Sequence, residues 1–440
     1  FNIVAYDSQV ESFRPELQRY DDKNRKAALG FVEGIYAGGS TNIDGALKAA
    51  LGQLQDDDQP SYVLFLTDGL PTAGETNEMK IVENAKGENK VRARIFTFGV
   101  GYDVNSRLLD KLVRENFGQS EYVKPDEDIE DRVSKLYNRI ESPVMTDVQI
   151  AFDFDEIKTE EGKPVSRVYP QGSFDLFAGE QLVVVGRYKK FGTAKVVVTG
   201  SVGSKKQKLD FPAKFVKKSK DETHAFIEKL WAVRRVGEIL DELDLKGKND
   251  ELVTELVKLS KRHGILTPYT SFMADDTGRV DDLATNVRRA GERLSALDRA
   301  SGAGGFLQRS LKSDFRSAAR APAASEPAGR PLMNAFSRQD GSVERAKAEG
   351  LDFAEDVANE AEAAFEKLRN VGNRTFYWRD GRWLDSKVTK AQEQNVTRVK
   401  QFSDDYFELA SRHGKKMSQY MVFDEPALIH LEDRAYLIEP

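Results

Sequence analysis

Short apolar runs alternate with amphipathic segments over the first 141 residues. Phe1–Tyr6 and Arg94–Val100 have the composition of strands, and Tyr62–Leu66 is a nearly continuous apolar run. Such a run is typical of a strand that is buried on both faces of a parallel sheet. Between the runs, apolar residues recur at helical spacing, as in Lys23–Tyr36. The alternation predicts an α/β fold with a doubly wound, mostly parallel sheet over residues 1–141.

The pattern changes at residue 142. Residues 142–220 contain apolar runs separated by Gly and Pro, which predicts an antiparallel β-sandwich. Helical spacing returns over residues 221–296, and a helical region is expected there. Residues 297–344 are rich in Gly, Ala, Ser and Pro and are expected to form a flexible linker. The remaining residues, 345–440, combine a helical pattern with short apolar runs, which predicts a small C-terminal α+β segment.

The C-terminal segment carries a hairpin signal. Two aromatic-rich runs flank Asp380-Gly381, a residue pair that is favoured in type I′ turns. Tyr377, Trp378 and Trp383 lie in these two runs. Aromatic residues in this arrangement either stack on sugar rings or pack a small core, and the second is the commoner use.

Composition and charge exclude several classes of protein. The 440 residues carry 66 basic and 72 acidic side chains, a net charge of −6, which excludes a wholly basic nucleic-acid binder. Cysteine is absent, so disulfides, thiolate metal sites and thiol nucleophiles are excluded. No apolar stretch reaches the roughly 18 residues of a membrane span. A lysine-rich stretch from Arg187 to Lys220 is either a polyanion site or, as we favour, a set of exposed strands protected from edge pairing.

Two loops carry candidate chemistry. Ligands of open parallel sheets bind at the carboxyl ends of the strands. Thr41 lies in the loop Gly38–Asn42 before a predicted helix, and Asp68 directly follows the strand Tyr62–Leu66. Their oxygens suit a hard cation such as Mg²⁺. The spacing equally allows Thr41 to be a helix cap and Asp68 to be a turn former.

Three segments resemble the second half of a von Willebrand factor A domain: FNIVAYDSQVESF, GGSTNIDGAL and YVLFLTDGLPT. The resemblance implies a metal-ion-dependent adhesion site that holds Mg²⁺ (or Mn²⁺) and accepts an acidic side chain from a partner protein. Thr41 and Asp68 match two of its metal ligands, and the loop positions Gly39, Ser40, Asn42 and Gly69 surround them. The resemblance to the A domain implies a binding module, not an enzyme.

This chain departs from the family in one respect. The family's other three ligands come from an Asp-x-Ser-x-Ser motif on the first strand, and no such motif precedes Thr41. Asp7-Ser8 is followed by Gln9 and Glu11 where serines are required. We expect that the first strand and first helix are missing through truncation; the alternative is a degenerate domain that never bound metal.

The resemblance extends to about residue 276. HAFIEKLWAVRRVGEILDEL and KRHGILTPYTSF resemble inter-alpha-trypsin inhibitor heavy chains and their bacterial relatives, which place a VIT domain before the A domain. This implies an extracytoplasmic or secreted location, with the signal peptide upstream of residue 1. His263, at the end of a predicted helix, is explained by a partial positive charge next to the helix carboxyl end.

Three hypotheses about function therefore remain. The first is a metal-dependent, non-catalytic protein-binding module, and the second is a metal-free structural or assembly module. The third is an Mg²⁺-dependent enzyme, which is disfavoured because no phosphate loop, nucleophile elbow or zinc-protease motif is present.

Overall fold

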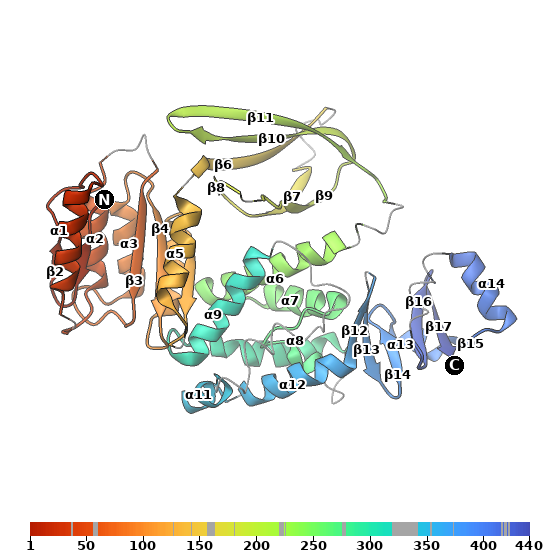
Figure 1. Ribbon diagram of the computed structural model, residues 1–440. Coiled ribbons are helices and arrows are strands. Elements are labelled where there is room, and N and C mark those ends of the chain that lie inside the picture. The colour runs from red at the N-terminus through yellow and green to blue at the C-terminus, as the bar shows by residue number, and fades with distance from the viewer. Residues whose placement is uncertain are drawn as a thin grey trace. The chain divides into compact units, whose positions relative to one another are not determined.

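The computed structural model is drawn in Figure 1. Its chain divides into two compact units. Unit 1 comprises Phe1–Lys217 and Arg299–Ser310, and unit 2 comprises Lys218–Asp298 and Leu311–Pro440. The structure describes residues 1–36, 38–55, 60–125, 127–141, 143–155, 163–179, 181–219, 224, 226–274, 279–318, 342–352, 354–372, 374–414, 417, 420 and 423–440.

Strands and helices alternate over the first 141 residues, as the sequence predicts. The elements are β1 (Val4–Tyr6), β2 (Val10–Ser12), α1 (Asp22–Glu33), α2 (Ile43–Gly52), β3 (Tyr62–Thr67), α3 (Glu78–Glu88), β4 (Arg94–Val100), α4 (Ser106–Glu115), β5 (Ser120–Val123) and α5 (Ile129–Ile140). Most of the helices begin at an Asn or Asp whose side chain accepts a backbone N–H of the first turn.

The strands of this region form two separate sheets. β3, β4 and β5 are parallel, with β4 in the centre, whereas β1 pairs only with β2, in antiparallel fashion, within the described residues. β4 is almost completely buried, but Leu66 of β3 is 41% exposed. The expectation that Tyr62–Leu66 is buried on both faces is therefore wrong for the described structure, because β3 is at the edge of the sheet that the described strands form.

Six strands follow. They are β6 (Pro143–Phe154), β7 (Val165–Tyr169), β8 (Phe174–Phe177), β9 (Val185–Tyr188), β10 (Gly192–Val202) and β11 (Lys205–Phe215). They pair in the order β11-β10-β6-β8 in one sheet and β7-β9 in another, and all pairings are antiparallel. The antiparallel β-region is thus present, and the lysine-rich stretch Arg187–Lys220 includes β10 and the exposed edge strand β11.

A buried ion pair joins the parallel sheet to the antiparallel region. Nε and Nη2 of Arg94, at the start of β4, donate to the two carboxylate oxygens of Asp175 in β8, at 2.7 and 2.8 Å. Phe177 of the same strand packs into the core formed by Phe96 and Phe98. Burial lowers the pKa of Arg94, but the hydrogen bonds with Asp175 more than offset this, so the pKa lies above its ordinary value.

Helices dominate the first part of unit 2. They are α6 (Phe226–Lys246), α7 (Asp250–His263), the 3₁₀ turn Ser271–Ala274, α8 (Leu283–Arg293) and the 3₁₀ turn Leu294–Asp298. The motif that begins at Gly264 is buried: Gly264 ends α7 in the left-handed conformation, and Thr267, Thr270 and Ser271 have no exposed surface. Its role in this structure is to pack the core.

His263, in the last turn of α7, is buried. Its pKa is lowered to about 3, first by burial and then by the charges of Arg262, Lys229 and Lys387. The imidazole is therefore neutral at physiological pH, so the expectation of a partial positive charge next to the helix carboxyl end is wrong.

The expected linker is wrong over much of its length. Residues Gly302–Ser317 form helix α9, which contributes residues to both units. In unit 1, Phe306 packs edge-on against Tyr102 and Tyr122, with ring centroids 5.2 and 5.6 Å apart. Burial of such aromatic groups outweighs the weak helix propensity of Gly and Ser. Residues 319–341, the other part of the predicted linker, lie outside the described residues.

The C-terminal segment contains helices and a six-stranded sheet. The elements are α11 (Ser342–Ala348), α12 (Ala354–Lys367), β12 (Leu368–Val371), β13 (Arg374–Arg379), β14 (Arg382–Asp385), α13 (Lys390–Gln394), β15 (Val396–Lys400), α14 (Asp404–His413), β16 (Ala427–Leu431) and β17 (Arg434–Glu439). The strand order is β12-β13-β14-β16-β17-β15. This segment shares unit 2 with α6–α8, whereas the sequence predicted a separate segment.

The predicted hairpin is confirmed. Trp378 pairs with Trp383, and Asp380 and Gly381 at the turn have φ values of 49° and 72°, as a type I′ turn requires. The two indole rings are 5.1 Å apart, and Trp383 belongs to a buried core cluster. The hairpin aromatics therefore pack a core, which is the interpretation that the sequence favoured. The hydroxyl of Tyr377 donates to the carbonyl of Lys261, which fastens β13 to α7.

Candidate functional site

Thr41 and Asp68 lie at the carboxyl end of the parallel sheet. Thr41 comes two residues before helix α2, whose N-cap is Asn42. Asp68 directly follows β3 and is exposed. Buried Ile43 anchors the start of α2, so the backbone of the Thr41 loop has a fixed end. Both predicted ligands thus occupy the edge at which parallel sheets bind ligands.

Direct hydrogen bonds hold the two loops together. The N–H of Thr41 donates to the hydroxyl of Thr72 at 2.8 Å, and the N–H groups of Thr72 and Ala73 donate to the carbonyl of Thr41 at 3.0 and 3.2 Å. A Cβ at Gly69 would lie 3.3 Å from the hydroxyl oxygen of Thr41, so the glycine permits this close approach. The Thr41 hydroxyl therefore lies next to Gly69, the residue that follows Asp68.

A third loop contacts the Thr41 loop from the side of β1. The N–H of Ser40 donates to the hydroxyl of Ser8 at 2.9 Å, and the N–H of Asn42 donates to the carbonyl of Asp7 at 2.8 Å. Gly39 has a φ of +81°, and a Cβ there would lie 2.9 Å from the Ser8 hydroxyl. Only glycine combines this conformation with this contact.

Sequence reasoning missed the positioning roles of Ser8 and Thr72. Asp7-Ser8 was considered only as a metal motif and was set aside because Gln9 and Glu11 do not match it. Their positions in the sequence could have indicated these roles. Ser8 follows β1 and Thr72 follows β3, so both lie after strands that end near the same edge. Neither is needed as a metal ligand to hold the loops in place.

Tyr6 links the two separate sheets. Its ring stacks on Phe65 at 5.6 Å, and its hydroxyl donates to the carbonyl of Leu66 at 2.9 Å. Burial raises the pKa of the Tyr6 phenol to about 12; a hydrogen bond with Thr67 opposes the rise, and the carboxylate of Asp68 adds to it. The phenol is therefore a neutral donor to one backbone carbonyl of β3. The edge of β3 that faces Tyr6 pairs with no other described strand.

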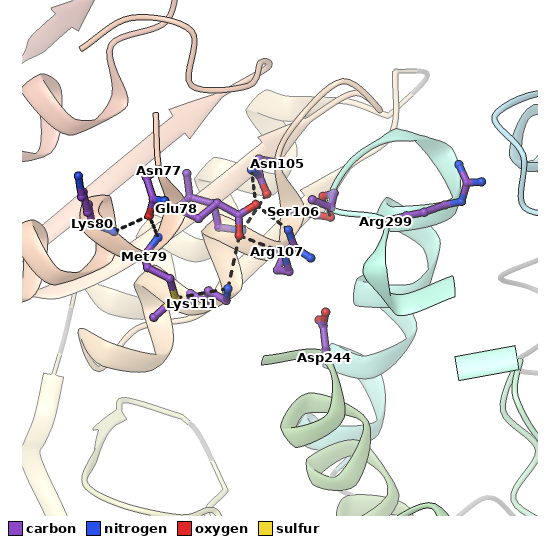
Figure 2. A network of polar contacts seen from close by, with 12 residues as sticks. Asn77, Glu78, Met79, Lys80, Asn105, Ser106, Arg107, Lys111, Asp244 and Arg299 are labelled. Carbon is purple, nitrogen blue, oxygen red and sulfur yellow. Dashed lines mark hydrogen bonds and ion pairs between the residues drawn. The ribbon is translucent and has the colours of Figure 1, made fainter. Parts of the chain in front are cut away.

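The Glu78 carboxylate joins the start of α3 to residues at the start of α4 (Figure 2). One of its carboxylate oxygens accepts from Asn105 and Arg107 at 3.0 Å each, and the other accepts from Arg107 at 3.0 Å and Lys111 at 3.4 Å. Burial alone would raise the pKa of Glu78, but these donors and charges lower it to about 2. A carboxylate held so firmly in its charged form ties α3 to α4 and is unsuited to accept a proton.

Thr41 and Asp68 do not satisfy Mg²⁺ by themselves. Thr41 and Asp68 supply two oxygen groups, whereas Mg²⁺ requires near-octahedral oxygen coordination. Among the described residues, no group of three or more His, Cys, Asp or Glu side chains is placed to hold a metal ion. No helix in the described part of the chain is long and apolar enough to cross a membrane.

Comparisons with known proteins bear on residues 1–122, which match the family model described as von Willebrand factor type A domain. The chain is 27% identical over 292 residues to inter-alpha-trypsin inhibitor heavy chain H4 of Homo sapiens, covering 62% of this chain and 30% of that protein. It is 25% identical over 319 residues to heavy chain H1 of Mesocricetus auratus, covering 68% and 34%. The matched part thus spans about a third of these curated relatives.

Among solved structures, von Willebrand factor type A from Catenulispora acidiphila is similar, with a TM-score of 0.42 and 13% identity over 73% of this chain and 81% of that one. The family model and the heavy-chain matches agree with the resemblance that the sequence of the first 122 residues shows to the A domain. The chain therefore carries a von Willebrand factor A-type domain at its start and is related in sequence to the inter-alpha-trypsin inhibitor heavy chains.

Proposed function

We propose that the A-type domain binds a partner protein at the sheet edge where Thr41 and Asp68 lie, without catalysis. The observation that supports this proposal most directly is a set of three hydrogen bonds of 2.8 to 3.2 Å between Thr41 and the loop after β3. We call this set the clamp. The clamp presents a hydroxyl and an exposed carboxylate from a rigid scaffold. These are the hard oxygen groups that suit Mg²⁺ or Mn²⁺.

Metal binding at this edge needs oxygen ligands in addition to Thr41 and Asp68. We propose that a further strand between β1 and β3 supplies them, as the resemblance to the A domain implies. Two observations support this: one edge of β3 pairs with no other described strand, and Leu66 on it is 41% exposed. An acidic side chain of the partner protein would complete the coordination of the ion. The proposed location, extracytoplasmic, follows from the relatives.

The test uses the full chain. Partner binding is expected with Mg²⁺ or Mn²⁺, and it is expected to be lost in EDTA and in Asp68→Ala. The matched control is Asp103→Ala, because Asp103 is an exposed aspartate in the loop after β4 at the same end of the sheet. Equal binding in EDTA, or equal losses in both variants, would contradict the metal-dependent site.

A metal-free assembly module is the second candidate. It is favoured by the bonds that Ser8 and Asp7 make to the Thr41 loop, since these bonds join the loops directly through protein groups. In this case binding persists in EDTA and in Asp68→Ala. It is lost in Gly69→Val, which would drive side-chain atoms against the Thr41 hydroxyl. An Mg²⁺-dependent enzyme would instead show turnover of phosphorylated substrates that Asp68→Ala abolishes.

A further inference from the structure

Strand β11 in unit 1 has a long edge at which another strand can pair. It stands at one end of the order β11-β10-β6-β8, next to β10 (Figure 1), and none of the described strands pairs with its other side. Its register with β10 runs over all 11 residues of β11 without a bulge. Residues 205–212 are all exposed. Many edge strands are short, bulged or covered, which prevents pairing with a further strand, and β11 is none of these within the described residues.

Pro212 indicates which backbone groups of β11 face the open side. It lies opposite Lys195 of β10 in the unbroken register. A proline has no N–H for a ladder, so in an edge strand its nitrogen faces away from the neighbouring strand. The N–H and C=O of one residue point to the same side of a strand, and this side alternates along the chain. The N–H and C=O groups of Lys206, Lys208 and Asp210 therefore face the open edge, and the run of outward donors stops before Pro212.

The side chains of β11 divide between a charged face and an apolar face. Lys206, Lys208 and Asp210 share one face of the sheet, because side chains alternate with a period of two. Leu209 and Phe211 share the other face, and they are 47% and 50% exposed. A strand added at this edge would cover part of this apolar surface while its alternate side chains meet the charged face.

The charges at this edge favour an acidic partner. Lys208 is 63% exposed and lies 3.8 Å from Asp210, which is the one acid of the strand. Lys206 is exposed, and no residue of the described part of the chain forms an ion pair with it. Carboxylates directly opposite Lys206 and Lys208 would form cross-strand pairs of opposite charge, which stabilise a sheet. A second copy of β11, with four lysines and one aspartate, would carry the same net charge and be repelled.

We propose that β11 accepts an extended segment of a partner protein as an additional antiparallel strand. The segment has carboxylates opposite Lys206 and Lys208 and apolar side chains that cover Leu209 and Phe211. Backbone hydrogen bonds along the edge supply affinity, and the alternation of acidic and apolar side chains supplies selectivity. A polysaccharide or a lipid surface would use the lysines alone and would leave the outward backbone groups unpaired. This surface goes beyond the function proposed for the loops of Thr41 and Asp68.

The experiment uses a fluorescently labelled peptide, acetyl-Val-Thr-Val-Glu-Val-Glu-Thr-amide. Paired antiparallel, it places its glutamates opposite Lys208 and Lys206 and its first threonine opposite Asp210. Fluorescence anisotropy during titration with the 440-residue chain is expected to show saturable binding. Hydrogen exchange of β11, read by mass spectrometry, is expected to slow when the peptide is bound. Absence of saturable binding overturns the proposal.

A second peptide separates strand pairing from attraction between charges. It has the same sequence with an N-methyl group on both glutamates, which keeps the carboxylates but removes two backbone donors that face β11. Its binding is expected to be lost, and binding equal to that of the first peptide overturns the proposal. Binding of heparin or of phosphatidylserine vesicles, without binding of the first peptide, would assign the lysines to a polyanion and overturn it as well. A stable dimer in sedimentation that Phe211→Lys dissolves would assign the edge to a second copy, with the same consequence.

Matched lysine variants place the peptide on β11. Lys206→Gln is expected to weaken binding about threefold, and Lys206→Gln with Lys208→Gln about tenfold, since each removes one cross-strand charge pair. Lys214→Gln is the control, because Lys214 is exposed on the same face of the same strand but lies beyond Pro212. It should bind as the wild type does, and so should Asp68→Ala, which separates this surface from the function proposed above. Equal losses in Lys206→Gln and Lys214→Gln would overturn the assignment.

Discussion

The ion pair between Arg94 and Asp175 provides a sharp test of how the A-type domain is joined to the antiparallel strands. We predict that Asp175→Ala strongly destabilises unit 1. The side chains of Arg94 and Asp175 are 7% and 5% exposed, and the variant would leave the guanidinium buried with one remaining carboxylate. That carboxylate is Asp147, at 3.2 Å from Arg94 and 40% exposed.

The magnitude follows from burial. Loss of one partner of a buried pair costs about 3–5 kcal/mol, because the other charge is left without compensation. Asp147 offsets part of this cost, so we expect a loss of about 2–4 kcal/mol. In a unit of this size, that loss lowers the melting temperature by roughly 5–15 °C. The matched control is Arg92→Ala, which removes an exposed pair with Asp147 and should cost under about 1 kcal/mol.

The assay must separate the two units. All three tryptophans, Trp231, Trp378 and Trp383, belong to unit 2, so their emission follows that unit. Hydrogen exchange of peptides from β4 and β8, read by mass spectrometry, follows unit 1. Asp175→Ala should accelerate exchange in β4 and β8 much more than Arg92→Ala does. If Asp175→Ala lowers the stability of unit 1 no more than Arg92→Ala does, the reasoning from burial is refuted.

Two further predictions concern other charged groups. Glu78→Gln should cost on the order of 2 kcal/mol at neutral pH, since the pKa of Glu78 is about 2 in the folded chain and 4.5 in the unfolded chain. A carboxyl group with a depressed pKa in the folded chain stabilises the fold at pH values above its unfolded pKa. The difference in unfolding free energy between wild type and Glu78→Gln, measured by urea unfolding, should therefore shrink as pH falls from about 4.5 towards 2. A difference that does not change with pH would contradict this. Lys312→Ala should cost about 3–5 kcal/mol, because Lys312 lies 3.0 and 2.8 Å from the fully buried carboxylates of Asp241 and Asp244. Unfolding followed by tryptophan emission, which reports on unit 2, measures this loss, and a loss below about 1 kcal/mol would show that the three side chains are not desolvated.

Much of the candidate site could be predicted from residues near each other in the chain. The loops with Thr41 and Asp68 follow from a glycine-rich segment before a helix and an aspartate after a strand. The clamp by Thr72 and the contact from Ser8 could not be predicted in the same way. Both bonds join residues about 30 positions apart, and no local pattern indicates which hydroxyl will face which N–H.

The sequence by itself determined the alternation of strands and helices and the hairpin at Asp380-Gly381, because periodicity and turn conformation depend on adjacent residues. Only the tertiary structure decided that β3 is an edge strand, that Gly302–Ser317 is a helix and that His263 is neutral. The physical reason is common to all three. Exposure and local potential are set by groups that folding brings together from distant parts of the chain, and burial then overrides local propensity.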